Sequence, residues 1–169
     1  MDDVISLSIG EPDFQTPWHI REEGINSLKN GKTWYSPNRG FAQLREEIAN
    51  YYARRFNISY EGKTQVLVTV GGSEAIDLAF RCLVSEGDEV IIPEPSFVCY
   101  EPLTHMAGGK AVIINTKAED EFRLKADDLE KAITDKTKLV VLPFPNNPTG
   151  AIMEKADLEA CLLYTSDAA

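Results

Sequence analysis

The chain has 169 residues, of which 17 are basic and 27 are acidic, and its formal net charge is −10. This acidity argues against a nucleic-acid partner, because phosphate backbones are bound by basic surfaces. The richest apolar stretch, residues 139–145, is far shorter than the ~20 residues of a membrane-spanning helix. We therefore expect neither nucleic acid nor a membrane among the partners.

The cytoplasm is the expected compartment. The cysteines are three, an odd number, at Cys82, Cys99 and Cys161, and no two are close in sequence. This pattern favours a reducing environment over a disulfide-bonded scaffold. The first residues show no basic start followed by an apolar run, so no secretory signal is expected.

Residues 1–62 are expected to form an N-terminal arm with helices. The pair Thr16-Pro17 is typical of a helix N-cap followed by the first helical residue, and Asn30-Gly31 is typical of a helix end. Residues 37–40 predict a turn. Apolar side chains then recur at helical spacing over residues 41–56, which predicts a second helix.

From residue 63 the pattern changes to alternating strands and helices. The expected strands are residues 65–70, 89–92, 110–115 and 138–142, and the expected helices are residues 74–84, 97–106, 127–133 and the segment from 154. Strands without polar alternation, separated by helices, are typical of a mostly parallel sheet with helices on both faces. We therefore expect a three-layer α/β domain over residues 63–160. Its strands should end at one edge, where such folds bind ligands.

A glycine-rich turn after the first expected strand is a candidate anion site. Gly71 and Gly72 allow the backbone to approach a ligand closely, and Ser73 with the first helical amides could hold a phosphate. The alternative is an ordinary tight turn in which Ser73 is the helix N-cap. The turn has neither the Gly-Lys-Ser/Thr of a Walker loop nor the Gly-x-Gly-x-x-Gly of a dinucleotide-binding turn.

Two further turns are rich in proline. In residues 93–100, Phe97 and Tyr100 could form a wall against a flat ring, or they could be core residues. In residues 143–150, asparagine side chains could donate hydrogen bonds at the sheet edge; the alternative is an Asn-Pro turn with a helix cap from Thr149. The density of constrained residues there favours a functional loop.

No metal site is expected. His19 and His105 have no companion at metal-ligand spacing. The densest acidic run, residues 119–121, is expected to be a solvated loop. Three nearby basic residues should neutralise it in part: Lys117, Arg123 and Lys125.

Five segments occur in a characteristic order. They are Gly10-Glu11-Pro12-Asp13-Phe14 with Thr16-Pro17; Tyr35-Ser36-Pro37-Asn38-Arg39-Gly40 with Leu44-Arg45-Glu46; Gly71-Gly72-Ser73-Glu74-Ala75; Pro93 with Pro95-Ser96-Phe97; and Asn146-Asn147-Pro148-Thr149-Gly150. In this series the chain resembles the class I/II, fold type I aminotransferases that use pyridoxal 5'-phosphate, and within them the aspartate and aromatic aminotransferase branch. The resemblance covers residues 5 to about 160 and implies an incomplete fold type I large domain.

The resemblance implies a role for each matched residue in holding the cofactor. Gly72, Ser73 and Glu74 would give backbone amides, and Ser73 also a hydroxyl, to the cofactor phosphate. Phe97 would stack on the pyridine ring, and Asn147 would hydrogen-bond the phenolic oxygen of that ring.

The resemblance also implies substrates and a partner. The reaction would transfer an amino group between an amino acid and a 2-oxo acid, with Gly10 beside the substrate carboxylate. The residue that matches Tyr35 reaches the cofactor phosphate of a second subunit, which implies a homodimer.

No catalytic residue of the family is expected within this chain. The lysine that forms the Schiff base lies well downstream in the family, and none of the lysines here has its sequence context. We therefore expect an N-terminal part of an aminotransferase, inactive alone, in which residues 161–169 are a non-native tail. The alternatives are part of a fold type I β-lyase that uses the same cofactor and a non-catalytic phosphate-binding module.

Overall fold

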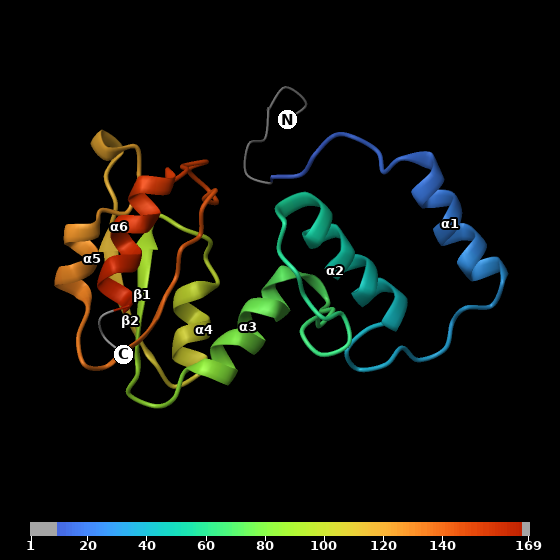
Figure 1. Cartoon of the computed structure of the whole chain (residues 1–169), viewed down its shortest axis with the longest axis horizontal. Coiled ribbons are helices and arrows are strands. Elements are labelled where there is room, and N and C mark those ends of the chain that lie inside the picture. The colour runs from blue at the N-terminus through green and yellow to red at the C-terminus, as the bar shows by residue number, and fades with distance from the viewer. Residues whose placement is uncertain (1–9, 167–169) are drawn as a thin grey trace, which may run out of the picture. The chain divides into compact units, whose positions relative to one another are not determined.

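The computed structural model describes residues 10–166 of the chain, in two compact units that divide between Leu67 and Val68. The N-terminal unit contains α1 (Trp18–Lys29) and α2 (Ala42–Phe56). The C-terminal unit contains α3 (Gly71–Leu83), β1 (Glu89–Glu94), α4 (Tyr100–Met106), β2 (Lys110–Asn115), the 3-10 helix η1 (Ala118–Asp120), α5 (Ala126–Ala132), β3 (Thr137–Val140) and α6 (Lys155–Ser166) (Figure 1). The division lies a few residues beyond the boundary expected at residue 62. In the part of the chain that the structure describes, no helix is long and apolar enough to cross a membrane.

The two helices of the N-terminal unit form where the sequence predicts them. α1 begins one residue late: Pro17 is its N-cap, so Thr16 is not the cap, and no side chain caps the helix. The helix ends at Lys29 with Asn30 as its C-cap, and Gly31 follows with a positive φ of 68° that glycine adopts without a steric penalty. The turn before α2 is closed by the backbone hydrogen bond from Gly40 N–H to the Pro37 carbonyl, 2.8 Å long.

Arg45 joins α2 to the segment that follows it. Its Nη1 donates to the carbonyls of Gly62 (3.2 Å) and Lys63 (2.8 Å). Gly62 packs so closely on α2 that a Cβ there would lie 2.9 Å from the Cα of Glu46, so only glycine fits without a shift. Most large apolar side chains of α1 and α2, and that of Phe41 just before α2, remain exposed: Trp18, Ile20, Ile25, Leu28, Phe41, Leu44, Tyr51, Tyr52 and Phe56.

The C-terminal unit is organised around a parallel sheet of order β2-β1-β3. β1 pairs in parallel with β2, from Glu89 opposite Lys110 to Glu94 opposite Asn115, and in parallel with β3 on its other edge. Both edges of β1 are therefore hydrogen-bonded, which is the arrangement that a fully buried strand requires. The sequence prediction of a parallel sheet is confirmed.

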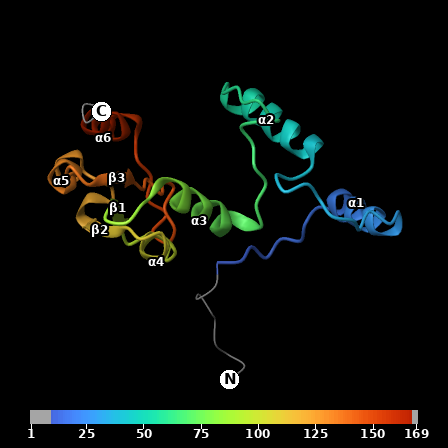
Figure 2. The ribbon, with the colours of Figure 1, turned by 90° about the horizontal axis from the view of Figure 1, so that it is seen from below.

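Helices cover both faces of this sheet, as expected. Val90 and Ile92 pack on the face with α3 and α4, and Ile91 between them packs on the face with α5 and α6 (Figure 2). This alternation follows from the two-residue period of a strand. Burial of one such side chain stabilises the fold by about 1.5–3 kcal/mol. The helical residues buried in these clusters are Phe80 on the first face, and Leu129 and Cys161 on the second.

Some predicted boundaries were wrong. Residues 65–70 form no strand. A strand needs a neighbour for its backbone N–H and C=O groups, and in residues 10–166 the sheet contains only β1, β2 and β3. The helix expected over residues 97–106 begins at Tyr100, after a turn in which Tyr100 N–H donates to the Phe97 carbonyl (3.4 Å).

The acidic run and the last helix also differ in detail from expectation. Arg123 pairs with Glu121, and Lys125 pairs with Asp120 at 2.7 Å, so the predicted partial neutralisation is confirmed for these two basic residues. α6 continues through Ser166, so the change in sequence pattern from residue 161 does not end the helix. Residues 167–169 of the expected tail lie outside the described residues.

A buried carboxylate joins three segments at the amino-terminal edge of the sheet. Glu89, at the start of β1, is 7% exposed. It accepts hydrogen bonds from the Thr134 hydroxyl (2.7 Å) and from Lys110 Nζ (3.0 Å). The hydrogen bond from Thr134, and then that from Lys110, lower the pKa of Glu89, because both stabilise its ionised form.

We predict that Glu89→Gln destabilises the chain at neutral pH and flattens its acid denaturation. Because the pKa of Glu89 is lowered by folding, its contribution is present above the pKa of the unfolded chain and is lost as pH falls through the folded value. The difference in unfolding free energy between wild type and Glu89→Gln should therefore be full at pH 7 and shrink below about pH 4. Urea denaturation at pH 7, 5, 4 and 3 measures it. The exposed Glu86→Gln is the control, and a difference that is the same at every pH would contradict the prediction.

Candidate functional site at the carboxyl edge of the sheet

The chain leaves the neighbouring strands β1 and β3 toward opposite faces of the sheet. α4 follows β1 and packs on the face of Val90 and Ile92, whereas α6 follows β3 and packs on the face of Ile91. In open α/β sheets such a point leaves a crevice outside the carboxyl ends of the two strands. The topology therefore predicts a ligand site between the loops that follow β1 and β3.

A cavity of about 340 Å³ lies at this position. It is lined by Phe97, Tyr100, Leu142, Pro143, Phe144, Pro145 and Asn147. Phe97 and Tyr100 come from the loop after β1 and the start of α4, and their rings meet edge to face with centroids 6.1 Å apart. The structure therefore brings Phe97 and Asn147, which are 50 residues apart (147 − 97), to one cavity. Burial raises the pKa of the Tyr100 hydroxyl.

The loop after β3 is held by its own hydrogen bonds. Asn146 N–H donates to the Ala151 carbonyl (2.9 Å), and Gly150 N–H donates to the Asn146 carbonyl (2.8 Å). The Thr149 hydroxyl accepts from Ala151 N–H (3.1 Å), inside this loop. Because α6 begins only at Lys155, the alternative interpretation of Thr149 as a helix cap is wrong.

The glycine-rich turn is part of a helix. Gly71 and Gly72 are the first two residues of α3 and Ser73 is the third, so Val70 is the N-cap and the interpretation of Ser73 as N-cap is wrong. Gly71 has a φ of 84°, which favours glycine at this position. The side chain of Glu74 accepts a hydrogen bond from Val70 N–H.

The first turn of α3 carries backbone donors that the helix itself leaves unpaired. Gly72, Ser73 and Glu74 are exposed, and the amides of Gly72 and Ser73 are among the first N–H groups of the helix, which have no partner within it. They do not line the cavity of Phe97 and Asn147.

Gly10 and Tyr35 belong to the N-terminal unit. Both are exposed, and no atom lies within 4 Å of the position of a Cβ on Gly10. The backbone of Gly10 and the hydroxyl of Tyr35 are therefore accessible to solvent.

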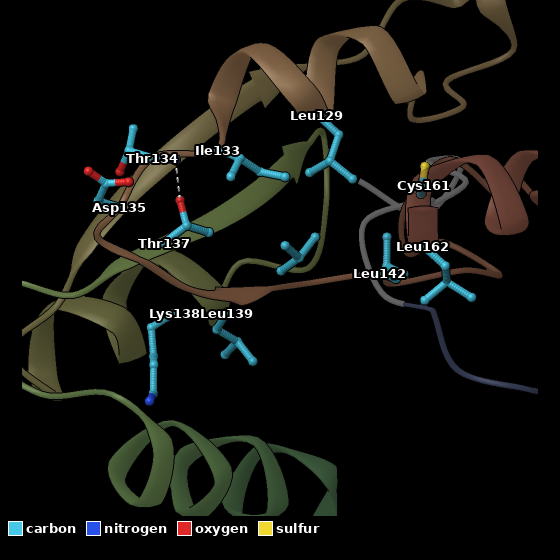
Figure 3. A pocket seen from close by; sticks show the side chains of 11 residues that line it. Leu129, Ile133, Thr134, Asp135, Thr137, Lys138, Leu139, Leu142, Cys161 and Leu162 are labelled. Atoms are coloured by element: carbon cyan, nitrogen blue, oxygen red, sulfur yellow. Dashed lines mark hydrogen bonds between the residues drawn. The ribbon is translucent and has the colours of Figure 1, made fainter. Parts of the chain in front are cut away.

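A larger cavity, of about 700 Å³, lies beside β3, α5 and α6 (Figure 3). Its lining is mainly apolar and includes Leu129, Ile133 and Leu139, with Cys161 from α6. The dashed contact in Figure 3 joins Thr134 N–H to the Thr137 hydroxyl (2.8 Å) within the turn before β3. None of the residues predicted to bind a ligand lines this cavity, so its size alone does not make it the candidate site.

The sequence profile of the family "Aminotransferase class I and II" matches residues 2–165. The chain belongs to this family. The family that the sequence motifs predicted is therefore confirmed.

Individual aminotransferases show the same relationship. The aromatic-amino-acid aminotransferase 2 of Thermococcus litoralis is 45% identical over 159 residues, which are 94% of this chain and 41% of that protein. The crystal structure of the aromatic aminotransferase of Pyrococcus horikoshii has 44% identity and a TM-score of 0.94, over 98% of this chain and 44% of that one. The aspartate aminotransferase of Thermus thermophilus, solved with maleate, has 38% identity and a TM-score of 0.90, over 96% of this chain and 42% of that one.

These similarities confirm the predicted fold class, because the matched structures are fold type I aminotransferases. The chain spans about two-fifths of the length of the curated relatives that it matches. It is thus an N-terminal part of the aminotransferase architecture.

Sequence reasoning missed two residues that hold loops of this aminotransferase part. Arg45 and Asn146 were noted only as members of motifs, yet Arg45 joins α2 to residues 62–63 and Asn146 is buried beside the cavity. The repeated Asn-Asn pair signals a polar loop, but a sequence does not show which asparagine turns inward.

We predict that the three thiols of the chain alkylate in the order of their exposure. Cys82 is exposed, whereas burial raises the pKa of the Cys99 and Cys161 thiols and so lowers their thiolate fraction. At pH 8 iodoacetamide should modify Cys82 about tenfold faster than Cys161, as measured by peptide mass spectrometry. In urea the three rates should converge. Equal rates for Cys82 and Cys161 in the folded chain would contradict the prediction.

Proposed function

We propose that this chain is the cofactor-holding N-terminal part of a pyridoxal 5'-phosphate-dependent aminotransferase that moves an amino group between an amino acid and a 2-oxo acid. The observation that carries the proposal is the meeting of Phe97 and Asn147 in one cavity at the carboxyl edge of the sheet. The names of the relatives, which are aminotransferases, support amino transfer over an elimination reaction.

The residues around the cavity fit the chemistry of this cofactor. Phe97 offers an aromatic surface for a pyridine ring, and Asn147 offers an amide N–H for the phenolic oxygen. The amides of Gly72, Ser73 and Glu74 stand in the first turn of α3, where backbone donors and the helix dipole favour a phosphate. The Ser73 hydroxyl adds one further donor.

When bound, pyridoxal phosphate supplies an electron sink for the carbanion that forms at the amino acid. The residues of this chain hold and orient it. Phe97 would offer its ring face to the pyridine ring, and Asn147 would stabilise negative charge on the phenolic oxygen by donating a hydrogen bond to it. The first turn of α3 would hold the phosphate through its backbone donors.

The substrate and the second subunit are assigned to the N-terminal unit. Gly10 would leave room beside the substrate carboxylate, and Tyr35 would donate its hydroxyl to the cofactor phosphate in a second copy of the chain. The exposed aromatic and aliphatic side chains of α1 and α2 support such a homodimer, because apolar surface of this kind favours association. The proposed compartment is the cytoplasm.

Pyridoxine 5'-phosphate tests the cofactor site, because it has the ring, the phenolic oxygen and the phosphate but no aldehyde to react with lysines. We predict that the chain binds it and that Phe97→Ala and Asn147→Ala each weaken the affinity about tenfold, or ~1.4 kcal/mol. Isothermal titration calorimetry measures this.

Val98→Ala is the matched control, because Val98 is the exposed neighbour of Phe97 and does not line the cavity. It should leave the affinity within about twofold of wild type, since surface substitutions have small effects. No binding by the wild-type chain, or an equal loss with Val98→Ala, would refute the assignment of the cofactor site.

The reaction is tested in the full-length protein that carries this chain. We predict glutamate formation from 2-oxoglutarate and an L-amino acid by that protein, and none by the 169-residue chain alone, because the lysine that reacts with the cofactor is absent from it. A coupled glutamate assay measures both. Amino transfer by the isolated chain would contradict the prediction.

A further inference from the structure

The loops after β1 and β3 are joined by one buried asparagine. Asn146 is 8% exposed, and its Nδ2 donates to the carbonyl of Pro95 at 2.7 Å. The contact spans 51 residues of sequence, from the loop after β3 to the loop after β1. The same Nδ2 also donates to the Thr149 hydroxyl at 3.0 Å, within its own loop.

The orientation of this amide follows from its partners. The Pro95 carbonyl can only accept a hydrogen bond, so the atom of Asn146 that faces it must be the NH2 group. Within the residues that the structure describes, the Asn146 Oδ1 atom is buried without a hydrogen-bond partner. An unpaired buried acceptor opposes part of the stabilisation that the two hydrogen bonds of Nδ2 provide.

The two joined loops carry the two sides of the cavity. Pro95 lies two residues before Phe97, and Asn146 directly precedes Asn147. We propose that Asn146 is a positioning residue, whose hydrogen bond to the Pro95 carbonyl sets the spacing between Phe97 and Asn147 across the cavity. The proposal rests on the proposed function only for the identity of the ligand.

A packing role and a positioning role make different demands on the side chain. Packing needs only the volume of Asn146, which aspartate reproduces. Positioning needs the N–H donor, which both Asn146→Asp and Asn146→Ala remove. An ionised carboxylate would in addition face the Pro95 carbonyl, oxygen to oxygen, and repel it. Thr149→Val is the matched control, because it removes the local partner of Nδ2 and leaves the hydrogen bond to Pro95 in place.

Hydrogen exchange with mass spectrometry tests the hydrogen bond between the two loops without any ligand. At pH 7, Asn146→Asp and Asn146→Ala should raise exchange about tenfold in both loops, residues 96–103 and residues 146–152, since each variant loses the part-buried hydrogen bond between the two loops as well as the one to Thr149. Thr149→Val should raise exchange only in residues 146–152. If exchange in the Asn146 variants rises only in residues 146–152, or if Asn146→Asp behaves as wild type, the proposal is overturned.

Ligand affinity provides the second test and separates positioning from general damage. Asn146→Asp and Asn146→Ala should weaken the affinity for pyridoxine 5'-phosphate about tenfold. They should leave the affinity for inorganic phosphate unchanged, because the first turn of α3 takes no part in the hydrogen bond between Asn146 and Pro95. An equal loss for both probes would overturn the proposal. If the wild-type chain binds no pyridoxine 5'-phosphate, the proposed function fails, and the exchange result alone then decides the role of Asn146.

Discussion

The C-terminal unit depends on the pairing of β1 with a strand on each of its edges. Val90, Ile91 and Ile92 are buried, so no water can satisfy the backbone of this segment. β2 and β3 supply the missing hydrogen bonds, both in parallel. Because successive side chains of β1 point to opposite faces, the same three residues also fix the two helical layers, α3 with α4 and α5 with α6.

The parallel arrangement has a direct consequence for function. All three strands end at the same edge, and the chain leaves β1 and β3 toward opposite faces of the sheet, so their loops diverge around a cavity. A parallel sheet does not itself fix how far apart two diverging loops stand. Here the side chain of Asn146 spans that gap to the Pro95 carbonyl. At the opposite edge, Glu89 joins β1 to β2 and to the turn before β3.

The agreement between sequence and structure was best where local and tertiary preferences coincide. Residues 110–115 alternate between two covered faces and form β2 with the predicted bounds. Residues 65–70 have similar β-branched composition but no neighbouring strand among the described residues, and they remain outside the sheet. Ser73 shows the same limit: its residue type favours an N-cap, but Gly71 with its positive φ already starts the helix two residues earlier.

The sequence by itself determined the α/β class, the family and the loops that carry the candidate site, because buried strands, helical periodicity and five ordered motifs are local patterns. Only the tertiary structure decided that Phe97 and Asn147 line one cavity and that Asn146, not Asn147, turns into the protein. The physical reason is that these facts depend on contacts between segments some 50 residues apart in sequence. Such contacts exist only after β1 has paired with β3 and brought the two loops to the same edge of the sheet.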